Sequence, residues 1–600
     1  MSSLAVGYVF SDRLKEEANA AGRNYWYAYV EEILSRLGVC AERMDVDACA
    51  QPRALSRYGV LVLGDFEASV LAERAQRALT DWVAAGGVLI AFATEGLDEL
   101  FGIVGGEKVP QPDGPFSISG YLELTPSAVT EDCRAPIEPQ QKLIIVSPIR
   151  LVRAPGCEEL ARLLLCDSDR PRDGKLTRDA HLPAITWRVL GGGHAFYCAF
   201  NVAQTMWAIQ QGRPIDRDYD GDGYLRASDA CVIGDNSRAV PYTDALHFLL
   251  ANMIGRRSVP MVHAVPPREG KVAPALLYFG GDDECSQGIH VPASDFMAAR
   301  GLPYHMNIMP VKGKFAIGKE EQAHIEANGH EIALHYNFMD GFDHPTGFTR
   351  EDVLEQARLF REAFGRDSVC TVCHWCRWTG WAEPARWMLE AGGHADNCRV
   401  HWTSPPINPI NLMGFAFGSS LPRYFWDDAA HGNARVDFLE LPMTAYEYGY
   451  EGENCYPEKV KEALALATRY HLTLNFFFHP VYVAKYPGCQ KAIDEMVRLM
   501  AEMPVPPVLM GPDAVCRWWQ ARSQATIKKA GHDGGRVLFE AQCDWKDGFV
   551  VKVATGNAPA RACRIDGKGA TLETAHEFGQ HWAFVPLAPG RHKVELTLSA

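Results

Sequence analysis

Three consecutive acidic residues, Asp282, Asp283 and Glu284, follow a strongly apolar run over residues 276–279. Carboxylates packed this closely repel one another, and they lose hydration at the end of a buried strand. A positive partner is therefore expected beside them, and a bound cation is the simplest one. The sequence predicts a cation site at the end of a strand near residue 282.

Histidines stand at the ends of three later strand-like runs, at positions 335, 374 and 479. His330 lies an odd number of residues before His335, so the two side chains face opposite sides of an extended segment. His335 is therefore the better candidate ligand. Because the carboxyl ends of parallel strands share one rim of a (β/α) array, we expect the acids and histidines to meet there.

The elements that must position these groups fall into three parts. Within the first part, residues 1–255, short apolar runs at helical spacing over the first hundred residues predict a doubly wound parallel α/β sheet. Further strand-like runs follow over 117–210, with a triple glycine at 191–193 where a hairpin would turn. A stretch rich in Pro, Gly and charge near 256–271 resembles a linker, and a second strand and helix alternation over 270–522 predicts a barrel-like (β/α) array. Residues 525–600 alternate apolar and polar positions, which predicts a small β-sandwich.

The region 270–522 resembles the polysaccharide deacetylase, or NodB-homology, family in the order of its short motifs. The matching segments are the Asp-Asp pair at 282–283, the Gly-His-Glu-Ile-Ala-Leu-His stretch at 329–335, an arginine within 373–381, and Phe-Phe-His at 477–479. The resemblance implies a distorted (β/α) barrel and metal-assisted hydrolysis of acetyl groups on sugars.

The same resemblance implies roles for individual residues. Asp282 would be the general base, His479 the general acid, and Arg377 the residue that keeps the base ionised and oriented. Asp283 and His335 would be metal ligands. The histidine that usually follows the first one by four residues is replaced by a methionine, so the third ligand is either His344 in a longer loop or His374 at a strand end; the more rigid strand end favours His374.

A divalent ion held by one carboxylate and two imidazoles, Zn²⁺ or another transition metal, leaves a position open for water. The expected activity is removal of acetyl groups, N-acetyl above all, from a carbohydrate. Trp375, Trp378 and Trp381 offer flat surfaces for sugar rings. Two alternatives stay open: a metal-free C–N hydrolase of the same superfamily, and a non-catalytic glycan-binding scaffold.

Residues 1–255 resemble the class I glutamine amidotransferase-like folds, including the ThuA-like and β-galactosidase trimerisation-like relatives. Active amidotransferases carry a Gly-x-Cys-x-Gly nucleophile elbow after a central strand. Here the candidate strand ends in Ala-Phe-Ala-Thr-Glu-Gly at 91–96, without a cysteine. We therefore expect a non-catalytic domain, which is compatible with a role in a homo-oligomer.

A second acidic segment, over 218–229, has the spacing of a calcium loop. The expected ligands at positions 1, 3, 5, 7 and 12 of the loop are Asp218, Asp220, Asp222, the carbonyl of Tyr224, and Asp229. Because the loop is single, we expect bound Ca²⁺ to act as a structural clamp.

The cysteines near the arginine motif have spacings that are also typical of haem attachment and of structural zinc sites. Cys370, Cys373 and His374 have the spacing of a c-type haem attachment site, and Cys376 makes half a zinc knuckle. Haem attachment requires export, for which no signal is visible, and a structural zinc needs a second ligand pair, whereas the next cysteine, Cys398, stands alone in the sequence. Free thiols are expected.

The charge composition of the chain limits which binding partners are expected. The 600 residues carry 59 Lys and Arg against 74 Asp and Glu, a net charge of −15, so nucleic acid and anionic membrane surfaces are poor partners and a carbohydrate substrate is expected. No stretch approaches the ~20 apolar residues of a spanning helix, and the first residues lack a basic signal-peptide region. With 17 scattered cysteines, a reducing cytoplasm is the expected location.

Overall fold

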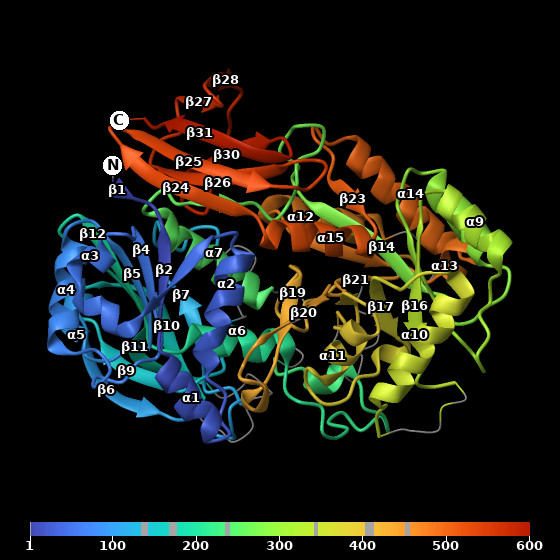
Figure 1. Ribbon diagram of the computed structural model, residues 1–600, viewed down its shortest axis with the longest axis horizontal. Helices are drawn as coiled ribbons and strands as arrows, with labels where there is room; N and C mark the ends of the chain where they lie inside the picture. Colours follow the sequence, from blue (N-terminus) through green and yellow to red (C-terminus); the bar gives the residue numbers. More distant parts are fainter. Residues whose placement is uncertain are drawn as a thin grey trace.

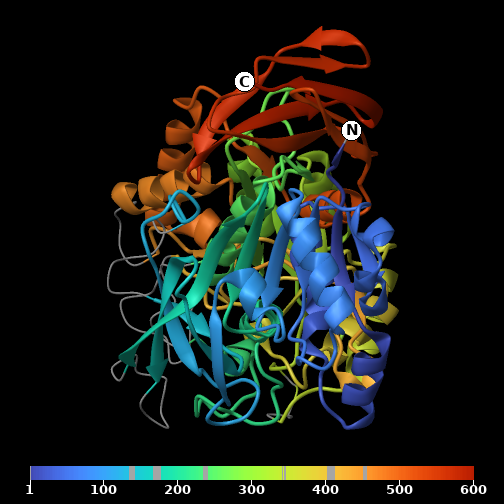
Figure 2. The same cartoon turned by 90° about the vertical axis from the view of Figure 1, so that its left-hand side faces the viewer.

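The computed structural model describes residues 2–133, 142–166, 177–233, 241–340, 342, 346–401, 413–450 and 456–599. Figure 1 shows an N-terminal sheet with its helices in blue to teal, a curled middle sheet in green to orange, and C-terminal strands in red that lie over both. The view turned by 90° again places the red strands above the N-terminal sheet (Figure 2).

The N-terminal sheet has nine strands in the described residues, in the order β3-β2-β4-β5-β12-β11-β10-β7-β8. Its parallel half consists of β2 (Val6–Phe10), β3 (Ala41–Asp45), β4 (Val60–Leu63), β5 (Val88–Phe92) and β12 (Gly193–Cys198). Its antiparallel half consists of β7 (Gly120–Leu124), β8 (Leu143–Ile145), β10 (Glu158–Cys166) and β11 (Thr177–Leu190).

The sheet is therefore mixed, and the prediction of a parallel sheet holds for only one half. An apolar run does not reveal strand direction when both faces of the strand are covered, so the runs over 117–210 indicated strands without fixing their direction outside the hairpin. The triple glycine at 191–193 does turn a hairpin, since Leu190 pairs with Gly193 between β11 and β12.

Helices α6 (Val202–Gln211) and α7 (Tyr242–Gly255) join this sheet to the middle region. Asn201 caps α6 by accepting the backbone N–H of Gln204, and the helix ends at Gly212, whose φ of +78° suits glycine. Every residue of α6 is buried, which a helix packed on both sides requires. The N-terminal part is thus fused to the middle region through a shared core.

The middle sheet has the order β19-β20-β18-β17-β16-β15-β14-β22-β21, with β23 paired to β14. Its strands are β14 (Leu276–Asp282), β15 (His305–Ile308), β16 (Glu331–Tyr336), β17 (Cys370–Cys373), β18 (Ala395–Asp396), β19 (Arg423–Trp426), β20 (Arg435–Glu440), β21 (Ala445–Tyr446), β22 (Thr473–Phe477) and β23 (Val508–Met510). All neighbours are parallel except β19 and β20. In the described residues no ladder joins β19 to β21, so the sheet is a curled, open barrel.

Helices surround this sheet, as expected for a (β/α) array (Figure 1). They are α8 (His290–Ala298), α9 (Lys319–Ala327), α10 (Arg350–Phe364), α11 (Glu383–Glu390), α12 (Pro457–Tyr470), α13 (Pro480–Lys485), α14 (Pro487–Ala501) and α15 (Pro512–Ser523). In the described residues, no helix combines the length and apolar character needed to cross a membrane.

The C-terminal strands form two packed sheets, ordered β1-β24-β25-β31-β27-β28 and β13-β26-β30-β29. The strands from the C-terminal part are β24 (Thr526–Asp533), β25 (Arg536–Cys543), β26 (Phe549–Gly556), β27 (Ala562–Ile565), β28 (Lys568–Ala570), β29 (Glu573–Glu577), β30 (Gln580–Leu587) and β31 (Gly590–Thr597). The sandwich also takes β1 (Ser2–Ser3) and β13 (Pro260–Val262) from other parts of the chain. The predicted linker is therefore partly a buried strand.

One contact between the first two parts bears on the site. Two isolated bridges, Ile215 with Gly380 and Arg226 with Arg377, lay the acidic loop against the segment that follows β17. The N-terminal part thereby contributes residues to the rim of the middle sheet.

Candidate functional site

The carboxyl ends of β14 and β22 open into a cavity of about 310 Å³. It is lined by Arg226, Asp282, Glu284, Trp375, Cys376, Met443, Tyr446, Phe477 and His479. Asp282 ends β14, and His479 follows β22, which is paired in parallel with β14. The two predicted catalytic side chains therefore do line one cavity, as strand ends on a common rim should.

Asp282 is buried and has two described neighbours. Its Oδ1 accepts a hydrogen bond from Asn307 Nδ2 at 2.9 Å, and its Oδ2 lies 3.4 Å from His335 Nε2. Burial raises the pKa of Asp282 well above its ordinary value, although His479 and Asn307 act in the opposite direction. Ionisation of this carboxyl group at neutral pH thus depends on positive charge close to it.

His479 lies between two acids to which the sequence analysis assigned no role. Its Nδ1 is 2.7 Å from Glu447 Oε1, and its Nε2 is 3.2 Å from Glu284 Oε1. Burial by itself lowers the pKa of an imidazole, but the two carboxylates outweigh it and hold the pKa of His479 well above its ordinary value. The two carboxylates therefore favour the protonated imidazole, the form that a general acid needs.

Glu284 and Glu447 share an unusual backbone conformation, with φ of +49° at each residue. A left-handed residue other than glycine costs on the order of 1–3 kcal/mol and persists where the surroundings enforce it. Glu284 belongs to the acidic run, but its spacing gave it no role, and no motif marks Glu447. The positive φ values could not be read from the sequence.

His335 and His374 lie together with their rings 5.1 Å apart. His335 is fully buried, and neither of its ring nitrogens has a hydrogen-bond partner in the described part of the chain. His374 Nδ1 lies 3.4 Å from Glu284 Oε2. Burial lowers the pKa of both imidazoles, that of His335 most, so both are neutral, the form that binds metals.

Asp283 points to a different set of partners. Its Oδ1 accepts the backbone N–H groups of Cys285 and Met309, each at 3.0 Å, and its Oδ2 lies 3.1 Å from His290 Nε2. Within the described ranges, neither Asp282 nor Asp283 joins His335 and His374 in a group of donors within 4.8 Å of one another. The carboxylate beside His335 is that of Asp282, and His344 lies outside the described residues.

Arg377 is buried and donates to backbone carbonyls, from Nε to Leu225 and from Nη1 to Phe338, both at 3.0 Å. The hydrogen bond described for the Asp282 side chain comes from Asn307 instead. Arg377 therefore fastens the loop of the N-terminal part to the end of β16. Its expected role in orienting the base has no support in these contacts.

The three tryptophans expected at the substrate have separate surroundings. Trp375 is 49% exposed and lines the cavity. Trp378 is fully buried, with its ring stacked on Phe425, so it is not accessible to a sugar. Trp381 is also buried and stacks on Trp207 beside a different cavity. The three tryptophans looked equivalent in the sequence, but the turns that follow β17 direct their side chains to different places.

The acidic loop brings together three of its predicted calcium ligands. Carboxylate oxygens of Asp218, Asp220 and Asp229 lie within 4.8 Å of one another. Asp222 is directed elsewhere, since its Oδ2 lies 2.7 Å from Arg226 Nη1 while its Oδ1 accepts the N–H of Tyr224. The loop therefore brings three of the predicted ligand carboxylates together and turns the fourth, Asp222, to Arg226.

The strand end that was compared with a nucleophile elbow carries Ala93. Its φ is +55°, and its side chain is a buried methyl group. The backbone has the left-handed conformation of a sharp strand-to-loop turn, but the position offers no nucleophile.

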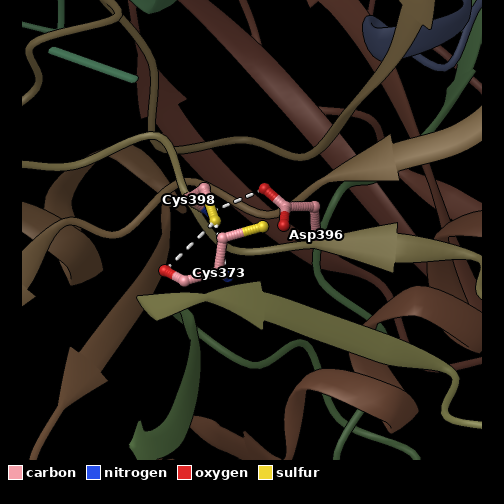
Figure 3. A group of neighbouring side chains, drawn as sticks. All are labelled: Cys373, Asp396 and Cys398. Atoms are coloured by element: carbon pink, nitrogen blue, oxygen red, sulfur yellow. Dashed lines mark hydrogen bonds between the residues drawn. The ribbon is translucent and has the colours of Figure 1, made fainter. Parts of the chain in front are cut away.

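The cysteines contradict one expectation. Cys398 does not stand alone, because its Sγ accepts the backbone N–H of Cys373 at 3.0 Å (Figure 3). The two residues are brought together by the pairing of β17 with β18, which the sequence spacing could not reveal.

No protein-family model matches the chain, and no curated protein matches its sequence. Among solved structures, a protein provisionally assigned as a polysaccharide deacetylase from Mycobacterium smegmatis is 17% identical, with a TM-score of 0.29 over 43% of this chain and 95% of that chain. A β-galactosidase from Rahnella sp. R3 is 16% identical, with a TM-score of 0.25 over 34% of this chain. This chain spans 30% of that β-galactosidase's length. Similarity of this extent does not bear on function.

Proposed function

We propose that the protein is a hydrolase that removes an acyl group, N-acetyl above all, from a carbohydrate. The observation that carries the proposal is the cavity shared by Asp282 and His479, with the His479 imidazole held between Glu447 and Glu284. Hydrolysis of an amide needs a base for the attacking water and an acid for the leaving amine. The two groups supply both.

His479 would protonate the leaving nitrogen through Nε2, the nitrogen that faces Glu284. Glu447, fully buried at Nδ1, fixes the ring and stabilises its charge. Departure of the amine is then coupled to transfer of the proton from His479 Nε2 to the leaving nitrogen. After turnover, solvent returns that proton to the imidazole.

Asp282 would accept the proton of the attacking water. Its ionised form requires nearby positive charge, which His479 supplies in part. A divalent ion would supply the rest, and it would also lower the pKa of bound water and polarise the acyl carbonyl.

The donor chemistry around Asp282 fits a divalent transition metal such as Zn²⁺. The fit rests on His335, a buried neutral imidazole without a hydrogen-bond partner in the described residues, 3.4 Å from a carboxylate. His335 and His374 would hold the ion. The carboxylate would come from Asp283 after its release from His290, because Asp282 is the proposed base.

The cavity walls support a sugar as the substrate. Exposed Trp375 and the rings of Tyr446 and Phe477 border the same space as the catalytic pair. The cavity volume of about 310 Å³ lies at the small end of ligand sites, ~300–1,000 Å³, which suits a single ring. Aromatic faces beside polar groups suit the apolar faces and hydroxyls of a pyranose.

A metal-free hydrolase of a C–N bond is a second candidate, favoured by one observation. The Asp283 carboxylate is already satisfied by His290 and two backbone N–H groups. Acetate release from N-acetylated oligosaccharides, measured with and without a chelator, separates the candidates. Retained binding with zero turnover would instead indicate a glycan-binding scaffold.

We also propose that the loop 218–229 binds Ca²⁺ as a clamp. Three converging carboxylates would repel one another without a cation, and the loop braces the cavity wall through Arg226.

A further inference from the structure

Three cysteines and an aspartate gather beneath the wall of the cavity. Strands β17 and β18 are parallel, with Cys370 opposite Ala395 and Thr371 opposite Asp396. Continuing this register places Cys398 opposite Cys373. Figure 3 shows the side chains of Cys373, Cys398 and Asp396 together.

The donor atoms of this group are close and fully buried. The Sγ atoms of Cys373 and Cys398 and a carboxylate oxygen of Asp396 lie within 4.8 Å of one another, and none of the three residues is exposed. Asp396 Oδ2 accepts the backbone N–H of Cys398 at 2.7 Å, which fixes the orientation of the carboxylate.

The thiol of Cys376 lies beside this group and acts electrostatically on the thiols of Cys373 and Cys398, although it is outside the set of donors that lie within 4.8 Å of one another. It reaches that position through a turn in which both Trp375 and Cys376 are left-handed, with φ of +57° and +51°. Two consecutive left-handed residues other than glycine are strained, and a bond to a metal would offset that strain. Cys373 and Cys376 have the two-residue separation of a zinc knuckle.

We propose that Cys373, Cys376, Asp396 and Cys398 form a structural zinc site. Zinc bonds sulfur at about 2.3 Å, so tetrahedral ligands lie ~4 Å from one another, in keeping with the observed grouping. Three thiolates and one carboxylate complete a four-coordinate shell. The donors are soft enough to favour Zn²⁺ over Ca²⁺ or Mg²⁺.

A buried arginine gives independent support. The guanidinium of Arg399 is 1% exposed, and its nitrogens have no hydrogen-bond partner in the described residues. It packs over Trp378 at 4.4 Å and acts electrostatically on Asp396. The carboxylates of Asp396 and Glu440 act electrostatically on this cation, and the net negative charge of three thiolates and a carboxylate around Zn²⁺ would stabilise it further.

The site would stabilise one wall of the cavity. Cys373 and Cys376 flank His374 and Trp375, and Cys376 itself borders the cavity. A bond from zinc to both cysteines would hold the two intervening side chains in place. The inference does not depend on the proposed function.

The test uses the full chain, produced with added zinc and freed of loosely bound metal. We expect about one zinc ion per chain that is released by a thiol-reactive mercurial and detected with a chromogenic chelator. Cobalt in its place should show thiolate-to-cobalt charge-transfer absorption. Cys398→Ser should lose this ion. Cys370→Ser, a fully buried cysteine on the same strand outside the group, should retain it.

His335→Ala separates this site from the candidate catalytic one, because it should leave the thiol-held ion in place. Absence of thiol-released zinc and of the cobalt–thiolate band in the wild type would overturn the proposal, as would an ion that survives in Cys398→Ser. A disulfide between Cys373 and Cys398 that persists in protein purified with reductant present would also overturn the proposal. If Cys398→Ser does not fold, the wild-type cobalt spectrum decides.

Discussion

Arg226 Nη1 lies 2.7 Å from Asp222 Oδ2 and thereby ties the acidic loop to the candidate active site. The same guanidinium donates from Nε to the backbone carbonyl of Trp375 at 2.9 Å, and Arg226 lines the cavity. A loop of the N-terminal part therefore helps to shape a cavity at the strand ends of the middle sheet. Order in the loop should influence substrate binding more than the chemical step.

Calcium should stabilise the protein through this loop. A ligand that binds only the folded state at 100 times its Kd adds about 2.7 kcal/mol to the free energy of unfolding. We expect Ca²⁺ to raise the melting temperature, and Asp218→Asn to abolish the increase. The control is Asp216→Asn, an exposed acid just before the loop. An unchanged melting temperature in saturating Ca²⁺ would rule out the clamp.

Trp375→Ala should impair binding without impairing folding. Its ring is 49% exposed beside the cavity, so KM should rise several-fold while the free energy of unfolding changes little. Trp378→Ala is the contrasting variant. Because that ring is fully buried, its removal should lower the free energy of unfolding by about 3–5 kcal/mol. Denaturant titrations and steady-state kinetics measure the two effects, and an unchanged KM in Trp375→Ala would remove the aromatic ring from the substrate site.

Glu447→Gln should shift the pH dependence of activity. Glu447 raises the pKa of His479, so its neutralisation lowers that pKa and His479 loses its proton at a lower pH. If activity requires the imidazolium, its decline at alkaline pH should begin at a lower pH in Glu447→Gln than in the wild type. The measurement is kcat/KM against pH. An alkaline limb at the same pH in both proteins would mean that His479 is not the acid.

His335→Ala should remove bound divalent metal from the cavity and reduce activity together. The imidazole is buried without a hydrogen-bond partner in the described residues, so its loss should cost little hydrogen bonding. His330→Ala is a suitable control, because His330 Nε2 bonds the carbonyl of Ser294 at 2.9 Å instead. The test is to measure metal content and activity in both variants and in the wild type. Full activity in metal-free wild-type protein would favour the metal-free hydrolase.

The sequence was sufficient to predict that Asp282 and His479 meet, because both follow apolar strands whose carboxyl ends share a rim. The sequence did not predict which side chains the Asp283 carboxylate contacts. Adjacent residues at a strand end point to opposite sides, and Asp283 turns to His290. Contacts of this kind depend on where helix α8 packs.

Other features depend on pairing between distant segments. Glu447 reaches His479 through the register of β21 with β22, and Cys398 reaches Cys373 through that of β17 with β18. The sandwich recruits Ser2–Ser3 and Pro260–Val262, which local periodicity assigns elsewhere. Apolar alternation identifies strands but not their partners.

Acetate release from N-acetylated oligosaccharides is the most direct test of the catalytic pair. Wild-type protein should release acetate, whereas Asp282→Asn and His479→Asn should be slower by roughly 10²–10⁴-fold while retaining the wild-type circular dichroism spectrum. No release by the wild type, or wild-type rates in either folded variant, would contradict the proposed function.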